Sequence, residues 1–131
     1  MMIDKIAWIR FENGRVLSAR TRGRDTFYFP GGKREPGESD LDTLIREVRE
    51  ELSVDVEPAT AVHVGTFEAQ AHNRPIGDLV RITCYTADVV GTPIASMEIE
   101  EIALLSYADR DRVSAVDKIA FDHFREQGLL D

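Results

Sequence analysis

The sequence predicts an α/β (α+β) fold in which a mixed central sheet packs against two main helices. Two segments, 41–52 and 113–124, carry apolar residues at the spacing of an amphipathic helix. The other apolar segments are short, rich in β-branched and aromatic residues, and separated by turn residues, as strands are. Strands, helix, strands and helix in this order bury their apolar faces by stacking in layers.

The predicted elements follow one another with short connections. Strands are expected at 3–11, 15–22, 27–29, 60–72, 79–90 and 99–107, with a turn at 73–77. Asn13-Gly14 is typical of a two-residue hairpin turn between the first two strands. The glycine-rich segment 31–38 is expected to be a loop, after which Ser39 or Asp40 caps the first helix.

Length and charge narrow the class of protein. The chain has 131 residues, the size of a single domain spanning 1–131. Its formal net charge of −8 argues against a partner that is bulk nucleic acid or an anionic membrane. A small anionic substrate remains compatible, because a bound divalent cation can reverse the local field. Without a long apolar run or a secretory signal, we expect a cytoplasmic monomer or homodimer with no membrane contact.

Several chemically notable residues are expected to be structural. Cys84 is the single cysteine, and its apolar surroundings predict a buried, unreactive thiol. His63, His72 and His123 have no metal-ligand spacing. Leu129 and Leu130 look exposed near the end of the chain, but two residues do not make an interface.

Three glutamates of the first predicted helix carry the main chemical signal. At about 100° per residue, Glu47, Glu50 and Glu51 lie within one arc at the margin of the apolar face. Such like charges repel, and Mg²⁺ or Mn²⁺ would relieve the repulsion because these cations prefer carboxylate oxygens. Arg46, four residues before Glu50, is expected to orient it. The alternative is that the acids form a solvated surface.

The spacing of these residues resembles the box of the Nudix hydrolases, G-x5-E-x7-R-E-U-x-E-E-x-G-U, where U is bulky and aliphatic. Eight of the nine specified positions match, namely Gly32, Glu38, Arg46, Glu47, Val48, Glu50, Glu51 and Val54. The approach Phe29-Pro30-Gly31-Gly32 resembles the MutT-type branch. The resemblance implies the Nudix α/β/α sandwich.

The one departure from the box is Ser53, where the family has glycine. That glycine resembles a residue that ends a helix in the left-handed conformation. Serine there is expected to cost roughly 1 kcal/mol of stability and to leave catalysis intact.

The resemblance also implies the roles of individual residues. Glu47, Glu50 and Glu51 would hold Mg²⁺ or Mn²⁺ together with the Gly31 carbonyl. Glu98 or Glu101 would add a fourth acid, with Glu98 preferred. Glu47 would help to deprotonate the attacking water, and Glu38 and Arg46 would orient the site. The residues expected to bind substrate are Arg20, Tyr28, Phe29, Gly32, Lys33 and Asp117.

The implied function is metal-dependent hydrolysis of a pyrophosphate bond in a nucleoside diphosphate linked to another group. The leading substrate is a nucleoside triphosphate, oxidised or not, giving a nucleoside monophosphate and pyrophosphate. Hydrolysis of a dinucleoside polyphosphate or a nucleotide sugar is the alternative within the same class. A non-catalytic Nudix module that senses a nucleotide is the alternative outside it.

Overall fold

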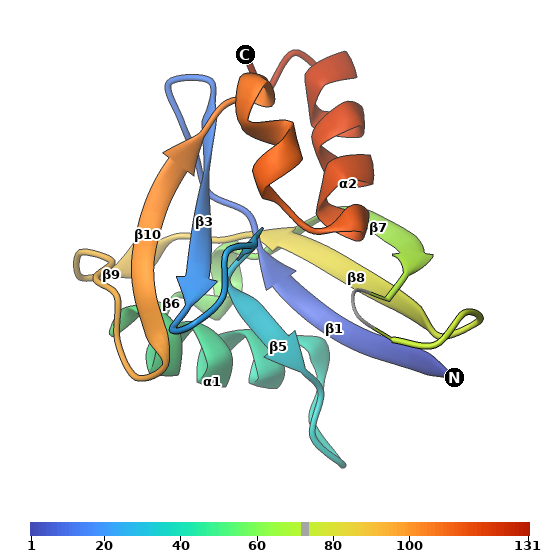
Figure 1. Cartoon of the computed structure of the whole chain (residues 1–131). Helices are drawn as coiled ribbons and strands as arrows, with labels where there is room; N and C mark the ends of the chain where they lie inside the picture. Colours follow the sequence, from blue (N-terminus) through green and yellow to red (C-terminus); the bar gives the residue numbers. More distant parts are fainter. Residues whose placement is uncertain (72–73) are drawn as a thin grey trace.

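The computed structural model describes residues 1–71 and 74–131, so the predictions made for His72 and Asn73 lie outside the described residues. Figure 1 shows the helices and strands arranged in layers. The helices are α1 (Asp40–Leu52) and α2 (Ala115–Glu126), with short 3₁₀ helices at Pro58–Thr60 and Tyr107–Arg112. The strands are β1 (Met2–Trp8), β2 (Phe11–Glu12), β3 (Arg15–Thr21), β4 (Phe27–Tyr28), β5 (Gly31–Lys33), β6 (Asp55–Val56), β7 (Val62–Gln70), β8 (Leu79–Thr86), β9 (Val89–Val90) and β10 (Ile99–Leu105).

One of the two four-stranded sheets is mixed, as predicted. Its strand order is β5-β1-β8-β7, in which β1 and β8 are parallel and the two outer strands are antiparallel to their neighbours. The β1–β8 register runs from Met2 opposite Leu79 to Trp8 opposite Tyr85. The other strands form a separate antiparallel sheet, β10-β3-β2 with β4 paired to β3, and a small β6–β9 pair.

The two helices cover opposite sides of the mixed sheet, which confirms the α/β/α layering (Figure 1). Beneath α1, Trp8 packs with Leu44, Val48 and Leu52 in one apolar cluster. A second cluster, beneath α2, includes the rings of Phe29, Phe121 and Phe124. Both faces of β1 are therefore largely buried, which agrees with its apolar residues on either side of Asp4 and Lys5. Among the described residues, neither helix has the length and apolarity needed to cross a bilayer.

Strands β2 and β3 of the second sheet are joined by a tight turn, and the C-terminal residues pack over this turn. Asn13 and Gly14 have φ values of 52° and 78°, which confirms the predicted hairpin turn between β2 and β3. The Asp131 amide donates to the Gly14 carbonyl at 2.8 Å. Leu130 is buried, so the expectation that it is exposed was wrong. The terminal segment folds back onto the turn, a contact between distant residues that composition does not reveal.

Two local predictions also need correction. Gly31–Lys33 is strand β5 and not part of a loop, because its backbone pairs with β1. The predicted strand 79–90 ends at Thr86 and continues, after a break, as β9. Glycine-rich composition lowers strand propensity, yet pairing with a buried neighbouring strand overrides that preference.

Helix α1 begins and ends as its sequence predicts. Ser39 is the N-cap: its Oγ accepts from the Asp42 amide, and the Asp42 carboxylate accepts from the Ser39 amide, both at 3.1 Å. Ser53 ends the helix with φ 56° and ψ 35°, the left-handed conformation expected at this position.

Replacing that serine should stabilise the protein. Ser53→Gly is expected to raise the free energy of unfolding by about 0.5–1 kcal/mol, because glycine adopts the left-handed conformation without a Cβ clash but loses more backbone freedom on folding. Urea unfolding measures the change, and Ser53→Ala, which keeps the clash, should show no gain. Turnover should stay within about twofold of the parent, since Ser53 lies outside the acidic face; a large fall in turnover would contradict the expectation.

Candidate active site

The start of α1 is tied to the mixed sheet by a polar cluster around Asp40. The Tyr85 hydroxyl on β8 donates to Asp40 Oδ2 at 2.5 Å, and Arg34 is paired with both Asp40 and Asp4. This hydrogen bond raises the pKa of Tyr85 to about 12. The cluster fixes the first turn of the helix, and with it the segment that carries Glu38.

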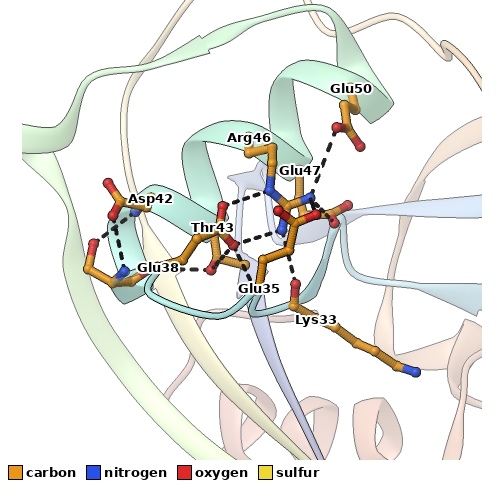
Figure 2. A network of polar contacts seen from close by, with 9 residues as sticks. Lys33, Glu35, Glu38, Asp42, Thr43, Arg46, Glu47 and Glu50 are labelled. Carbon is orange, nitrogen blue, oxygen red and sulfur yellow. Dashed lines mark hydrogen bonds and ion pairs between the residues drawn. The ribbon is translucent and has the colours of Figure 1, made fainter.

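Arg46 is the centre of the network in Figure 2. Its guanidinium donates to the two oxygens of Glu38 at 2.7 and 2.9 Å, to Glu47 Oε1 at 2.7 Å and to the Lys33 carbonyl at 3.1 Å. Planar guanidinium groups are suited to this two-pronged contact with a carboxylate. The arginine thus joins strand β5, the following loop and α1 in one arrangement.

The charges of this network stabilise one another. The bond to Arg46, helped by the Glu35 amide, lowers the pKa of Glu38 to about 2. Glu38 in turn raises the pKa of Arg46. The predicted pair of Arg46 with Glu50 is present only as a long ion pair, with Nη1 and Oε1 4.0 Å apart, whereas the hydrogen bonds of Arg46 to carboxylates go to Glu38 and Glu47. The position of the loop that carries Glu38, and not the spacing along the helix, decides which carboxylate Arg46 binds most closely.

Glu51 is the buried acid of the site, with 8% of its surface exposed. Its Oε1 accepts from the Gly31 amide at 3.2 Å, and within the described chain its carboxylate joins no ion pair. Burial raises the pKa of Glu51 to about 8 against this hydrogen bond, and the charges of Glu47 and Glu98 raise it further. Burial also raises the pKa of Glu47, opposed by Arg46. Without a cation, the protein alone therefore favours the protonated, uncharged form of Glu51 at neutral pH.

Two glycines of β5 let the strand approach the acids. Gly31 has φ 145°, and a Cβ there would lie 2.0 Å from the Ile6 carbonyl oxygen. A Cβ on Gly32 would lie 2.5 Å from the Glu47 carboxyl carbon. Glycine at these two positions thus permits close contact with β1 on one side and with Glu47 on the other.

The third glutamate of the helix is the most exposed of the three. Glu50 leaves 48% of its side chain exposed and lies at the edge of the network in Figure 2. Across residues 1–71 and 74–131, no three His, Cys, Asp or Glu side chains are already grouped as a metal site. The structure thus brings together two of the three predicted ligands, Glu47 and Glu51. Glu50 is on the same helical face and would have to turn toward them.

The two candidates for a fourth acidic ligand, Glu98 and Glu101, lie near different charged residues. Glu98 lies near enough for its charge to raise the pKa of Glu51. Glu101 instead accepts from Arg20 on β3, with Nη2 and Oε1 3.1 Å apart. Arg20 is also paired with Glu100 and is absent from the cavity described next, so its predicted role in substrate binding is not supported. Alternation along β3 turns Ala19 and Thr21 toward the cavity instead.

A cavity of about 390 Å³ extends from Glu51 to the N-terminus of α2. The residues predicted from the sequence that line it are Tyr28, Phe29, Gly31, Gly32, Lys33, Glu51 and Asp117. Its volume lies within the range of small-molecule binding sites. The cavity therefore joins the predicted metal end and the predicted nucleoside end of the site.

Asp117 occupies the end of the cavity away from the helix acids. It lies in the first turn of α2, only 2% exposed, and its Oδ2 accepts from the Phe29 amide at 2.8 Å. Burial raises the pKa of Asp117 to about 7, with the Phe29 hydrogen bond opposing. A buried carboxyl that lines a cavity is suited to accept hydrogen bonds from a ligand.

Sequence reasoning missed Lys5. This half-buried lysine of β1 lines the same cavity, and its Nζ lies 5.4 Å from the centre of the Tyr28 ring. Burial lowers the pKa of Lys5, and the Asp117 charge opposes this effect. The available signal was the charged pair Asp4-Lys5 inside an otherwise apolar strand, where charged side chains are unusual.

The remaining sequence expectations concern residues outside the cavity. Cys84 is buried, and burial raises the pKa of its thiol, so an inert core cysteine is confirmed. His63 contacts the Thr66 hydroxyl at 2.9 Å. His123 packs against Phe67 and Phe124. Both histidines make structural contacts.

The site and the fold agree with the comparison to known families. The family model described as NUDIX domain matches residues 5–124, and the chain therefore belongs to the NUDIX family. The MutT protein from Methanosarcina mazei Go1 superposes with a TM-score of 0.76 at 22% identity, covering 97% of this chain and 95% of that one. The fold is that of the MutT-type Nudix hydrolases, as the sequence predicted.

Two curated relatives are similar over part of their length. The RNA pyrophosphohydrolase of Halorhodospira halophila is 46% identical over 43 residues, which is 33% of this chain and 24% of that protein. The CTP pyrophosphohydrolase of Escherichia coli is 33% identical over 79 residues, 57% of either chain. The chain thus covers less than two thirds of either relative.

Proposed function

We propose that this chain hydrolyses a pyrophosphate bond in a nucleoside diphosphate linked to a further group. The leading substrate is a nucleoside triphosphate, oxidised or not, which water cleaves to a nucleoside monophosphate and pyrophosphate. The observation that supports the proposal is the single cavity shared by Glu51, the β5 glycines and Asp117. A nucleotide would match the two ends of this cavity, with its phosphate chain near Glu51 and its base near Asp117.

The acidic end of the cavity fits a divalent cation. Glu47, Glu50 and Glu51 would hold Mg²⁺ or Mn²⁺, with Glu98 and the Gly31 carbonyl as further ligands. The fit rests on Glu51, a buried carboxylate that no ion pair within the described residues neutralises. When bound, such a cation neutralises phosphate charge and makes a water molecule more acidic.

The chain's own residues would orient the substrate and accept a proton. Glu47 is the proposed base, and Arg46 fixes it through the 2.7 Å bond. Lys33 would contact the phosphates from β5, where its side chain points away from the Arg46 network (Figure 2). Tyr28 and Phe29 would line the nucleoside end, and Asp117 would accept from an N–H group of the base.

A substrate screen tests this proposal. Purified protein with Mg²⁺ is incubated with ribonucleoside and deoxyribonucleoside triphosphates, oxidised dGTP, a dinucleoside polyphosphate, ADP-ribose and a nucleotide sugar. We expect pyrophosphate and a monophosphate from one or more triphosphates, with activity lost on EDTA and restored by Mg²⁺. Release of inorganic phosphate alone, or product formation unaffected by EDTA, would contradict it. Thermal stabilisation by a nucleotide without any product would favour the sensing module instead.

A further inference from the structure

Lys5 is one of three charged residues lining the cavity, with Arg24 and Arg74, that the proposed chemistry does not use. It lies in the middle of β1, opposite Lys33 of β5 and Ile82 of β8, with strands paired on both sides. Its backbone position is therefore set by two neighbouring strands. Lys5 therefore lines the cavity from a rigid strand and not from a flexible loop.

The ammonium has no bonded partner in the described chain, although the charges of Asp117, Glu51 and Glu47 favour it from a distance. Within residues 1–71 and 74–131, Lys5 makes no side-chain hydrogen bond and no ion pair within 4 Å. Its nearest specific contact is the face of Tyr28, 5.4 Å from the ring centre, which attracts a cation weakly. Solvent in the open cavity must supply the hydrogen bonds that a lysine requires.

A ligand that fills the cavity changes this balance. A base lying over Tyr28 would displace that solvent and complete the burial of the ammonium. An ammonium buried without an acceptor is strongly unfavourable, whereas one that donates to a carbonyl oxygen is stabilising. Lys5 therefore favours ligands that place a carbonyl oxygen beside it.

We propose that Lys5 is a specificity-determining residue that donates a hydrogen bond to a carbonyl oxygen of the nucleobase, while Asp117 accepts from an N–H group of the same base. This inference rests on the proposed function, since it concerns the nucleoside end of that site. Guanine, cytosine and uracil bear ring carbonyl groups, and adenine bears none. The pair thus selects carbonyl-bearing bases against adenine.

The chemistry of the two side chains supports this assignment. Lysine donates to base carbonyl oxygens, and carboxylates accept from base amino groups, in other protein–nucleobase contacts. A site built to hydrogen-bond a group rejects an analogue that lacks it, because the buried partner is left without a bond. Where guanine has its O6 carbonyl, adenine has an amino group, which is a donor and cannot accept from the Lys5 ammonium.

Steady-state kinetics with four substrates test the proposal. We measure kcat/KM for GTP, CTP, UTP and ATP with the parent protein and with Lys5→Met, which keeps much of the side-chain length without the charge. The kcat/KM of the preferred carbonyl-bearing nucleotide should fall roughly 10- to 100-fold. That for ATP should change by less than about threefold, so the preference itself is lost. The preferred substrate of the parent shows which carbonyl-bearing base is bound.

Two further variants make the result specific. Lys118 is next to Asp117 in the sequence but does not line the cavity. Lys118→Met removes the same charge and should leave the preference for carbonyl-bearing nucleotides over ATP unchanged. Lys5→Gln keeps a neutral donor and should restore part of the preference. An equal fall for all four nucleotides with Lys5→Met would overturn the proposal, because Lys5 would then act on the phosphates.

Failure of the inference is distinguishable from failure of the proposed function. If the parent hydrolyses no nucleotide in the presence of Mg²⁺, the proposed function fails. If the parent hydrolyses nucleotides but prefers ATP, or if Lys5→Met leaves the preference unchanged, only the role of Lys5 fails. Circular dichroism and thermal melting of each variant confirm that the comparison is made between folded proteins.

Discussion

Glu51→Gln is expected to reduce metal-dependent hydrolysis by about 10²–10⁴-fold, because it removes a charged ligand from the most buried position of the proposed metal site. The substitution conserves shape, and an amide oxygen can still accept from the Gly31 amide as Oε1 does at 3.2 Å. Folding should therefore be retained while turnover is lost. The measurement is kcat at saturating Mg²⁺ with the best substrate of the screen.

The same variant is also expected to change how stability depends on pH. Burial raises the pKa of Glu51 from 4.5 to about 8 in the folded chain. The protonated Glu51 makes its full contribution to the free energy of unfolding below about pH 4.5. This contribution is lost as the pH rises toward 8, because the folded chain must then release the proton. Without metal, the melting temperature of the parent should fall over this window more steeply than that of Glu51→Gln. At pH 8, Mg²⁺ should stabilise the parent and have little effect on the variant.

A matched control removes the same charge at a distance. Glu126→Gln changes an exposed glutamate at the end of α2 and should leave both turnover and the Mg²⁺ response unchanged. Undiminished turnover in Glu51→Gln would contradict the proposed metal site. So would a Mg²⁺ stabilisation equal to that of the parent.

The second large effect is expected from Gly31→Ala, which should lower the free energy of unfolding by about 3–5 kcal/mol. The added Cβ would lie 2.0 Å from the Ile6 carbonyl oxygen, which belongs to the backbone of β1 and cannot rotate away. The φ of 145° is also unfavourable for any residue with a Cβ. Urea unfolding measures the loss.

Gly32→Ala separates stability from catalysis at the neighbouring position. Its Cβ would meet the Glu47 carboxyl group, the movable end of a side chain, with the nearest atom at 2.5 Å. Stability should therefore fall by less than about 1 kcal/mol, while displacement of Glu47 should lower turnover roughly 100-fold. Gly37→Ala, where a Cβ meets no atom within 4 Å, controls for the strain of a positive φ. Equal stability of Gly31→Ala and Gly37→Ala would contradict the close-packing argument.

Much of the local structure was predictable from neighbouring residues alone. The spacing of apolar residues located both helices to within about two residues, and Ser39 and Asn13-Gly14 marked a helix start and a hairpin turn correctly. These features depend on contacts between residues close in the chain, such as caps and turns. The left-handed Ser53 was predictable for the same reason.

The partners of the charged residues were less predictable. Helical spacing suggested that Arg46 pairs with Glu50, but the loop brings Glu38 closer and takes the guanidinium. Arg20 was expected at the substrate and instead pairs with Glu101 of β10. In both cases the loop conformation or the strand pairing brings a different acid to the arginine, and neither can be read from helical spacing.

By itself the sequence determined the helical segment with its acids, the glycines that precede it and the family to which the chain belongs. These are local patterns, since a helix repeats every few residues and a strained backbone position requires glycine. Only the tertiary structure decided that Gly31–Lys33 is a strand, that Glu51 is buried, and that Lys5 and Asp117 share a cavity. Strand pairing and burial depend on residues far apart in the chain, and no local spacing specifies them.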